Sequence, residues 1–268
     1  MKSFFVALFL LVSAASAYEF PFPTPTAQRK APPGLEGLFW NKWDTDHFSV
    51  LSIDKSYGNK VQSFIESERA DILRRWSIRG SDDFYCKLVC VKDKEMLKKM
   101  FSIDDPRCEV ISRSDGTPEV AAIWIDADRI GMLPSLLLEA ELSFDEYPLY
   151  IKRGVPFFER PSPKSSLEFA SSTPCSSITD AKKSESLFKT NARSFDADSA
   201  ILCLMARKEF GRLRFAEVAR PGESDLPGIL GFESQKDLDD TFARYRNNIL
   251  QDVKDGKTPE DYLGVLGK

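Results

Sequence analysis

Two acidic side chains in an apolar segment are the first candidates for chemistry. Glu139 and Glu141 lie in LLLEAELSF, residues 136–144, where nearly every other residue is apolar. Paired carboxylates can share acid–base work, but residues two apart on a helix point in nearly opposite directions. The pair is therefore not a catalytic dyad. Because this helix has little polar surface, at least one carboxylate should face the core or a cleft, where it needs a partner or a function.

A second acidic pair follows an apolar run. Asp126 and Asp128 lie in IDADR, residues 125–129. Carboxylates at the end of a strand can bind metals or bases. More often they cap the next helix or lie in a solvated turn, and we expect one of these structural roles here. Serine-hydrolase, P-loop, C-x-x-C and glycine-rich dinucleotide motifs are not found in the sequence.

The cysteines form no recognisable catalytic or metal-binding pattern. Cys86 and Cys90 are four residues apart in an expected strand, about 13 Å apart at ~3.3 Å per residue, which is too far for a mutual disulfide. Either could reach Cys108 across a hairpin, or all could be small buried apolar groups. A catalytic thiol is less favoured, because the single histidine, His47, is distant in the sequence. The pairing stays open among all five cysteines: Cys86, Cys90, Cys108, Cys175 and Cys203.

Composition excludes several classes of protein. The chain of 268 residues has 37 basic and 41 acidic side chains and a formal net charge of −4, without the basic excess typical of nucleic-acid binding. Hydrophobic residues make up 42%, with 20 Phe and 4 Trp, which is enough for a packed core. The length fits one large domain or two small ones.

Residues 1–17 have the pattern of a signal peptide. Lys2 is followed by an apolar run over 4–12 and by Ala-Ser-Ala at 15–17. A membrane anchor would need about 20 apolar residues. We therefore expect an exported protein, periplasmic or extracellular, that begins near Tyr18 and has no membrane span after cleavage.

Four further segments follow the signal peptide. We expect a proline-rich leader over 18–44, an α/β lobe over 45–158, a flexible loop over 159–187 rich in Ser, Pro, Thr and Lys, and a helical lobe over 188–268. Strands and helices come first and helices alone come later, an order typical of an α+β fold with a helical C-terminal part.

Apolar periodicity locates the expected elements. In the first lobe, strands are expected over 47–53, 84–91 and 120–125, with a loop over 104–117 that contains an Asp-Gly turn. Helices are expected from about 61 to 79, over 94–101 with Asp93 as its cap, and over 133–144. In the second lobe we expect helices over 200–210, capped by Asp198 or Ser199, over 235–250 and over 259–265.

The run VAAIWIDADRIGMLPSLLLEAELSFDEYPLYIKRGVPFFE, residues 120–159, resembles the core of gluzincin-type zinc peptidases, particularly the bacterial peptidase MA-like group. In that group a strand precedes a helix carrying H-E-x-x-H, and a W-x-x-E-G-x-A-like segment on a second helix supplies the third zinc ligand. Residues 138–142 match the first motif and residues 150–156 match the second. The resemblance covers roughly residues 45–250 and implies a small mixed sheet with an active-site-type helix.

The departures from that family concern the metal ligands. Leu138 and Leu142 occupy the histidine positions and Arg153 the position of the glutamate ligand, while Glu139 matches the general base. Zinc in such peptidases needs two imidazoles and a carboxylate, and one histidine per chain cannot supply them. The resemblance therefore implies an inactive metallopeptidase homologue, a pseudoenzyme without metal or other cofactor.

Three functions remain open. The first is a non-catalytic binding or structural protein with a peptide or protein ligand. The second is an active hydrolase that uses Glu139 without the ancestral zinc site, together with Asp126 or a cysteine. The third is an inhibitor-like protein that captures peptides in a vestigial cleft.

The resemblance also predicts one specific contact. A carboxylate at position 139 would be partly desolvated, and a guanidinium at the former ligand position would compensate its charge. We therefore expect a salt bridge between Glu139 and Arg153, with an internal cation in place of zinc.

Overall fold

The computed structural model describes residues 40–160, 178, 181–220, 222 and 225–256. Several expected features lie outside these residues: the signal peptide, the leader up to residue 39, most of the loop between 161 and 180, Cys175, and the helix over 259–265.

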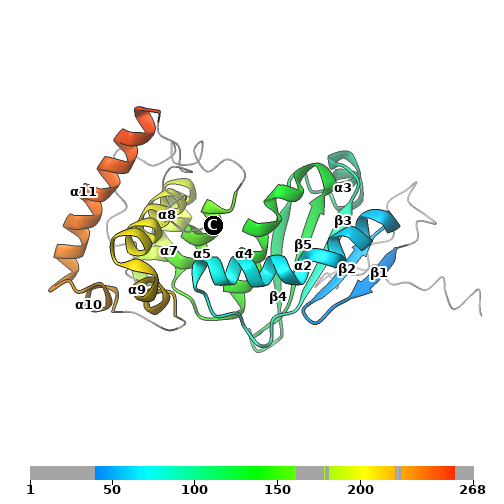
Figure 1. The fold of residues 1–268 in the computed structure, drawn as a ribbon, viewed down its shortest axis with the longest axis horizontal. Helices are drawn as coiled ribbons and strands as arrows, with labels where there is room; N and C mark the ends of the chain where they lie inside the picture. Colours follow the sequence, from blue (N-terminus) through cyan, green and yellow to red (C-terminus); the bar gives the residue numbers. More distant parts are fainter. Residues whose placement is uncertain (1–39, 161–177, 179–180, 221, 223–224, 257–268) are drawn as a thin grey trace, which may run out of the picture.

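The protein has an α+β fold, as the sequence predicted, built on a mixed five-stranded sheet with the order β1-β2-β3-β5-β4 (Figure 1). The central strands β2, β3 and β5 are parallel, and each edge strand is antiparallel to its neighbour. The strands are β1 (Asn41–Asp44), β2 (Phe48–Ser52), β3 (Cys86–Val91), β4 (Arg107–Ser112) and β5 (Pro118–Asp126).

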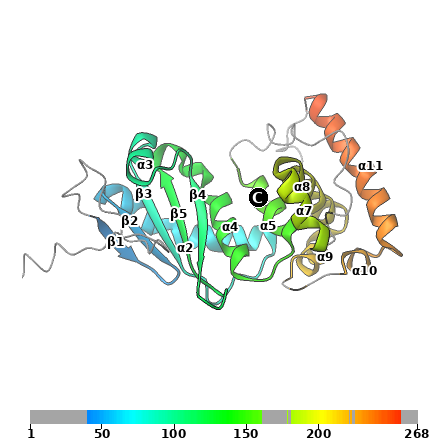
Figure 2. The same ribbon diagram turned by 180° about the vertical axis from the view of Figure 1, so that it is seen from behind.

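Helices cover both faces of the sheet. On one face α2 (Lys55–Trp76) and α4 (Leu133–Phe144) pack against the strands and against each other, over a core that includes Val50, Leu88 and Ile123. On the opposite face α3 (Lys94–Phe101), capped by Asp93 as expected, covers a smaller cluster around Val89, Ala122 and Trp124. Figure 2 shows α3 and the sheet from behind.

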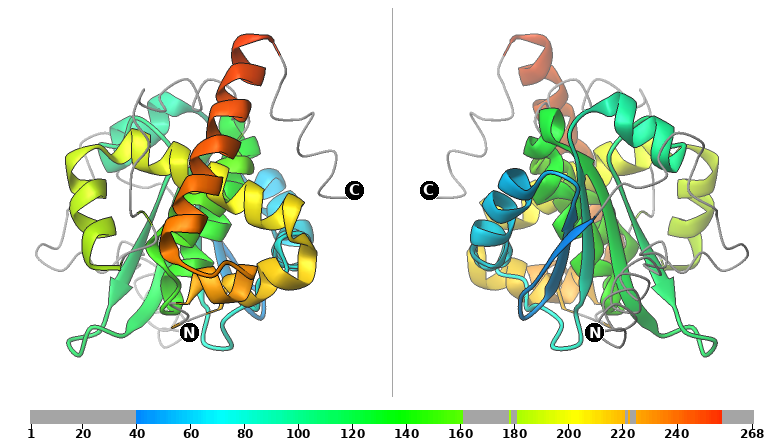
Figure 3. Two further views of the ribbon diagram at one scale, coloured as in Figure 1. Left: turned by 90° about the vertical axis from the view of Figure 1, so that its left-hand side faces the viewer. Right: turned by 90° about the vertical axis from the view of Figure 1, so that its right-hand side faces the viewer.

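The C-terminal part is helical, as expected, and adjoins the sheet through α4 and α5. In Figure 1 it forms the half of the molecule away from the strands, and Figure 3 shows α11 lying across its far end. Within the described residues its elements are α5 (Leu149–Phe158), α7 (Ala181–Thr190), α8 (Ala192–Glu209), α9 (Gly211–Val218), α10 (Leu226–Leu230) and α11 (Gln235–Lys254).

Close contact between α5 and α8 fixes the geometry of the helical part. A Cβ atom added at Gly154 of α5 would lie 2.5 Å from the carbonyl oxygen of Ser199 in α8. Only glycine therefore permits this approach. The residue before it, Arg153, is thereby brought next to the first turns of α8.

Three expectations for the first part of the chain were wrong. Residues 107–112, expected within a loop, form the edge strand β4, which pairs with β5. Its sequence RCEVIS alternates between exposed and partly buried residues, so it lacks the continuous apolar run of a central strand. Residues 41–44, assigned to the leader, form β1. The long helix, expected from about 61 to 79, runs from Lys55 to Trp76 and ends where Ser77 takes a left-handed conformation with φ of 54°.

Two expectations for the second lobe were also wrong. Helix α8 begins at Ala192 with Asn191 as its cap, so Asp198 and Ser199 are buried in mid-helix. Asp198 instead accepts a 2.6 Å hydrogen bond from Arg246 Nε of α11. Residues 181–187, expected within the loop, belong to α7.

Among the described residues, no helix is both long enough and apolar enough to cross a bilayer.

Candidate functional site

The two glutamates of α4 have different environments. Glu141 is 2% exposed and accepts hydrogen bonds from Nε and Nη2 of Arg69, both at 2.8 Å, and from the backbone N–H of Ser81 at 2.7 Å. Arg69 itself lies over the ring of Phe84, 4.9 Å from its centroid. Since both oxygens of Glu141 are occupied, this carboxylate connects α4 to α2 and to the segment before β3. It has a structural role.

Glu139 is the carboxylate of α4 with access to solvent. Its side chain is 35% exposed, and its Oε1 lies 3.4 Å from Nη1 of Arg153 on α5. Partial burial raises the pKa of Glu139, and the nearby charge of Arg153 opposes that rise. The contact predicted between these two side chains is therefore present, at the long end of the hydrogen-bonding range.

The closer partner of Arg153 is Asp196 on α8. Nε and Nη2 of Arg153 donate to the two oxygens of Asp196 at 2.8 and 2.7 Å, a bidentate geometry. The guanidinium also lies 4.7 Å from the ring centroid of Phe188 on α7. Burial alone would lower the pKa of Arg153, but Asp196 and Glu139 together raise it. Arg153 is thus a fixed cation held by α4, α5, α7 and α8.

The residues at the positions that the resemblance assigns to zinc ligands cannot bind zinc. Leu138 and Leu142 are 1% and 0% exposed and belong to the apolar core. Arg153 has only N–H donors and a positive charge, whereas zinc needs lone pairs. Within the described part of the chain, no group of three or more His, Cys, Asp or Glu residues is arranged to hold a metal ion.

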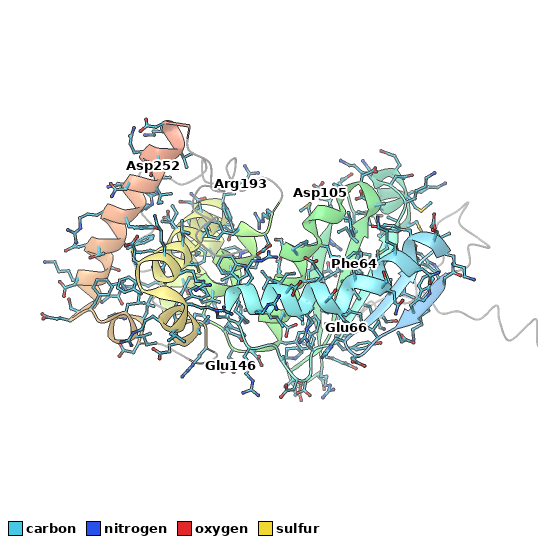
Figure 4. All side chains as sticks on the ribbon, in the orientation of Figure 1. Phe64, Glu66, Asp105, Glu146, Arg193 and Asp252 are labelled. Carbon is cyan, nitrogen blue, oxygen red and sulfur yellow. The ribbon has the colours of Figure 1, made fainter. Side chains whose placement is uncertain are left out.

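Of the remaining acidic and imidazole candidates, Asp126 and His47 have structural partners. Asp126 is fully buried, caps the short 3₁₀ helix η1 (Ala127–Met132) and accepts from Arg129 Nε at 2.7 Å, while Asp128 is exposed. His47 Nδ1 lies 2.9 Å from Oε2 of Glu66, which is labelled on α2 in Figure 4. Asp126 therefore has the helix-capping role that was expected, and His47 lies directly before β2.

In the part of the chain that the structure describes, four cysteines are free thiols: Cys86, Cys90, Cys108 and Cys203. The hairpin considered for Cys108 does not form with β3, because β5 lies between β3 and β4 and Cys108 faces Ile123 instead. Burial raises the pKa of all four thiols. Since the thiolate is the reactive form, these cysteines are poor nucleophiles.

Titration of Glu139 should have a measurable effect on stability. Its ordinary pKa is 4.5 and the folded protein raises it, so the folded state holds the proton more tightly than the unfolded state does. The contribution of Glu139 to stability is therefore greatest below about pH 4.5 and falls as pH rises through the folded pKa. Glu139→Gln removes this titration. Urea unfolding gives the stability of the wild type and of the variant, and the wild-type value minus the variant value should fall as the pH rises above about 4.5. A constant or rising difference would contradict the assignment.

Comparison of the chain with protein-family models and with curated proteins gave no match. The function is therefore argued from the geometry of the site.

Proposed function

We propose that the protein is an exported, peptidase-like protein that has lost its zinc ligands and acts by binding or as a structural component instead of by catalysis. One observation carries the proposal. Arg153 occupies the position that the resemblance assigns to the third zinc ligand, and it is held there by Asp196 while it contacts Glu139. A cation that already compensates Glu139 would repel Zn²⁺ from the same place.

The ligand we propose is a peptide segment of a partner protein. Glu139 and Arg153 are 35% and 23% exposed, so together they present an acceptor and a donor to solvent. A peptide backbone carries the matching N–H and C=O groups at every residue. The bidentate bond to Asp196 fixes the orientation of Arg153, which lowers the entropy lost when a ligand binds.

An active hydrolase is the second candidate, and the raised pKa of Glu139 favours it, because a partly exposed carboxyl with a raised pKa suits a general base. The second group that such a hydrolase would need is harder to supply. Asp126 is fully buried and paired with Arg129, and the four described thiols are poorly reactive. These contacts favour the binding protein.

A hydrolysis screen separates the two candidates. The mature protein, incubated with a quenched-fluorescence peptide library, should give no more cleavage than its Glu139→Gln variant. The same library, immobilised, should retain the wild type, and Arg153→Met should weaken that retention. Cleavage by the wild type that Glu139→Gln abolishes would establish the hydrolase instead.

A further inference from the structure

Guanidinium groups gather where α2 ends against α8 and α9. Arg74 and Arg75, in the last turn of α2, have carboxylate partners: Arg74 pairs with Asp71 at 2.6 Å and Arg75 pairs with Glu159 at 2.6 Å. Arg207, near the end of α8, and Arg212, in the first turn of α9, differ from them. Within the described residues, no carboxylate lies within salt-bridge distance of either guanidinium. Two positive charges therefore adjoin each other, and neither has an acidic partner among the residues that the structure describes.

Both side chains reach the last carbonyl groups of α2. Arg212 donates from Nε to Ser77 Oγ at 2.6 Å and from Nη2 to the carbonyl oxygen of Arg74 at 2.7 Å. Arg207 donates from Nη2 to the neighbouring carbonyl oxygen of Arg75 at 3.4 Å. The two guanidiniums are thus held at adjacent places, with most of their N–H donors uncommitted.

One of those donors is buried. Nε of Arg207 is shielded from solvent and has no hydrogen-bond partner in the described structure. Burial, and after it the charge of Arg212, lowers the pKa of Arg207. A buried, unpaired donor on a cation costs free energy, and such a group in a folded protein often marks the place of a water molecule or an ion.

We propose that Arg207 and Arg212 form a binding site for a soluble phosphate-type oxyanion, such as inorganic phosphate or pyrophosphate. The planar guanidinium matches the oxygen geometry of phosphate. An oxyanion between the two groups would remove their mutual repulsion. The first turn of α9, which has no side-chain cap, adds the positive end of a helix dipole, and this offsets the negative end of α2 at the same place. Arg212 is exposed, so the ion has access.

This inference is independent of the proposed function, since the site involves none of Glu139, Arg153 and Asp196. It is tested by titrating the mature protein with pyrophosphate in a calorimeter, at low ionic strength and without phosphate buffer. We expect saturable binding of one ion per chain. Arg207→Met and Arg212→Met should each weaken it about tenfold or more, the loss expected for a charge-assisted hydrogen bond.

Arg214→Met is the matched control, because Arg214 lies on the same helix but is exposed and paired with Glu217. This variant should bind as the wild type does. Since Arg212 also caps α2, the thermal stability of each variant is measured first. The variant Arg207→Lys keeps the positive charge but loses the planar guanidinium, so it should bind pyrophosphate with intermediate affinity. The proposal would be overturned if the wild type showed no saturable binding, which would leave a water molecule as the partner of Arg207 Nε. It would also be overturned if Arg214→Met weakened binding as much as Arg207→Met and Arg212→Met do.

Discussion

Glu141→Gln is expected to lower the free energy of unfolding by about 3–5 kcal/mol, the range for breaking a buried ion pair. Glutamine keeps the shape of the side chain but leaves the guanidinium of Arg69, which is only 13% exposed, without its counter-charge. The amide also cannot accept all three of the hydrogen bonds that Arg69 and Ser81 donate with the strength of a carboxylate. Urea unfolding at neutral pH measures the effect.

The double variant Glu141→Leu with Arg69→Met should recover part of that loss, because no charge is then stranded. Glu217→Gln is the control: its exposed pair with Arg214 should contribute less than about 1 kcal/mol. If Glu141→Gln cost no more than this control, the structural role of Glu141 would be wrong.

Arg153→Met and Asp196→Asn should each cost about 2–3 kcal/mol, less than a fully buried pair because Arg153 is 23% exposed. Glu139→Gln should cost less than about 1 kcal/mol, since its contact with Arg153 is longer and more exposed. The resemblance predicted a salt bridge between Arg153 and Glu139, but the shorter, bidentate contact of Arg153 is with Asp196. The structure assigns the larger share to Asp196.

Two double-mutant cycles measure this difference. The coupling energy between Arg153 and Asp196 should exceed about 1 kcal/mol, and the coupling between Arg153 and Glu139 should be smaller. Equal coupling energies would show that Glu139 is as strong a partner as Asp196. Near-zero coupling in both cycles would show that the three side chains do not form a cluster in solution.

Strong periodicity made much of the fold predictable. Helices α3 and α4 occur at their predicted residues, and the central strands lie within two residues of theirs, because each buries a continuous apolar face. The edge strand β4 was missed because one of its sides faces solvent, and the start of α8 was misplaced because Asp198 is a normal capping residue that here pairs with Arg246. Both errors depend on tertiary contacts that a local pattern does not contain.

The candidate site was partly predictable for the same reason. The apolar helix indicated that at least one of Glu139 and Glu141 needed a partner or a function, and both have partners. Asp196 carries the same signal, an acidic residue in the apolar helix SFDADSAILCLMA, but its helix was expected to begin later. Its partner Arg153 is 43 residues away, and only the close packing of α5 against α8 at Gly154 brings the two together.

The zinc content of the purified mature protein tests the central proposal most directly. After mild dialysis, we expect much less than one zinc ion per chain by elemental analysis, and EDTA should leave the melting temperature unchanged. This follows because Leu138, Leu142 and Arg153 offer no lone pairs to a metal. Close to one zinc ion per chain, removed by EDTA with a fall in melting temperature, would contradict the proposal that Arg153 and its two carboxylates stand in place of the metal.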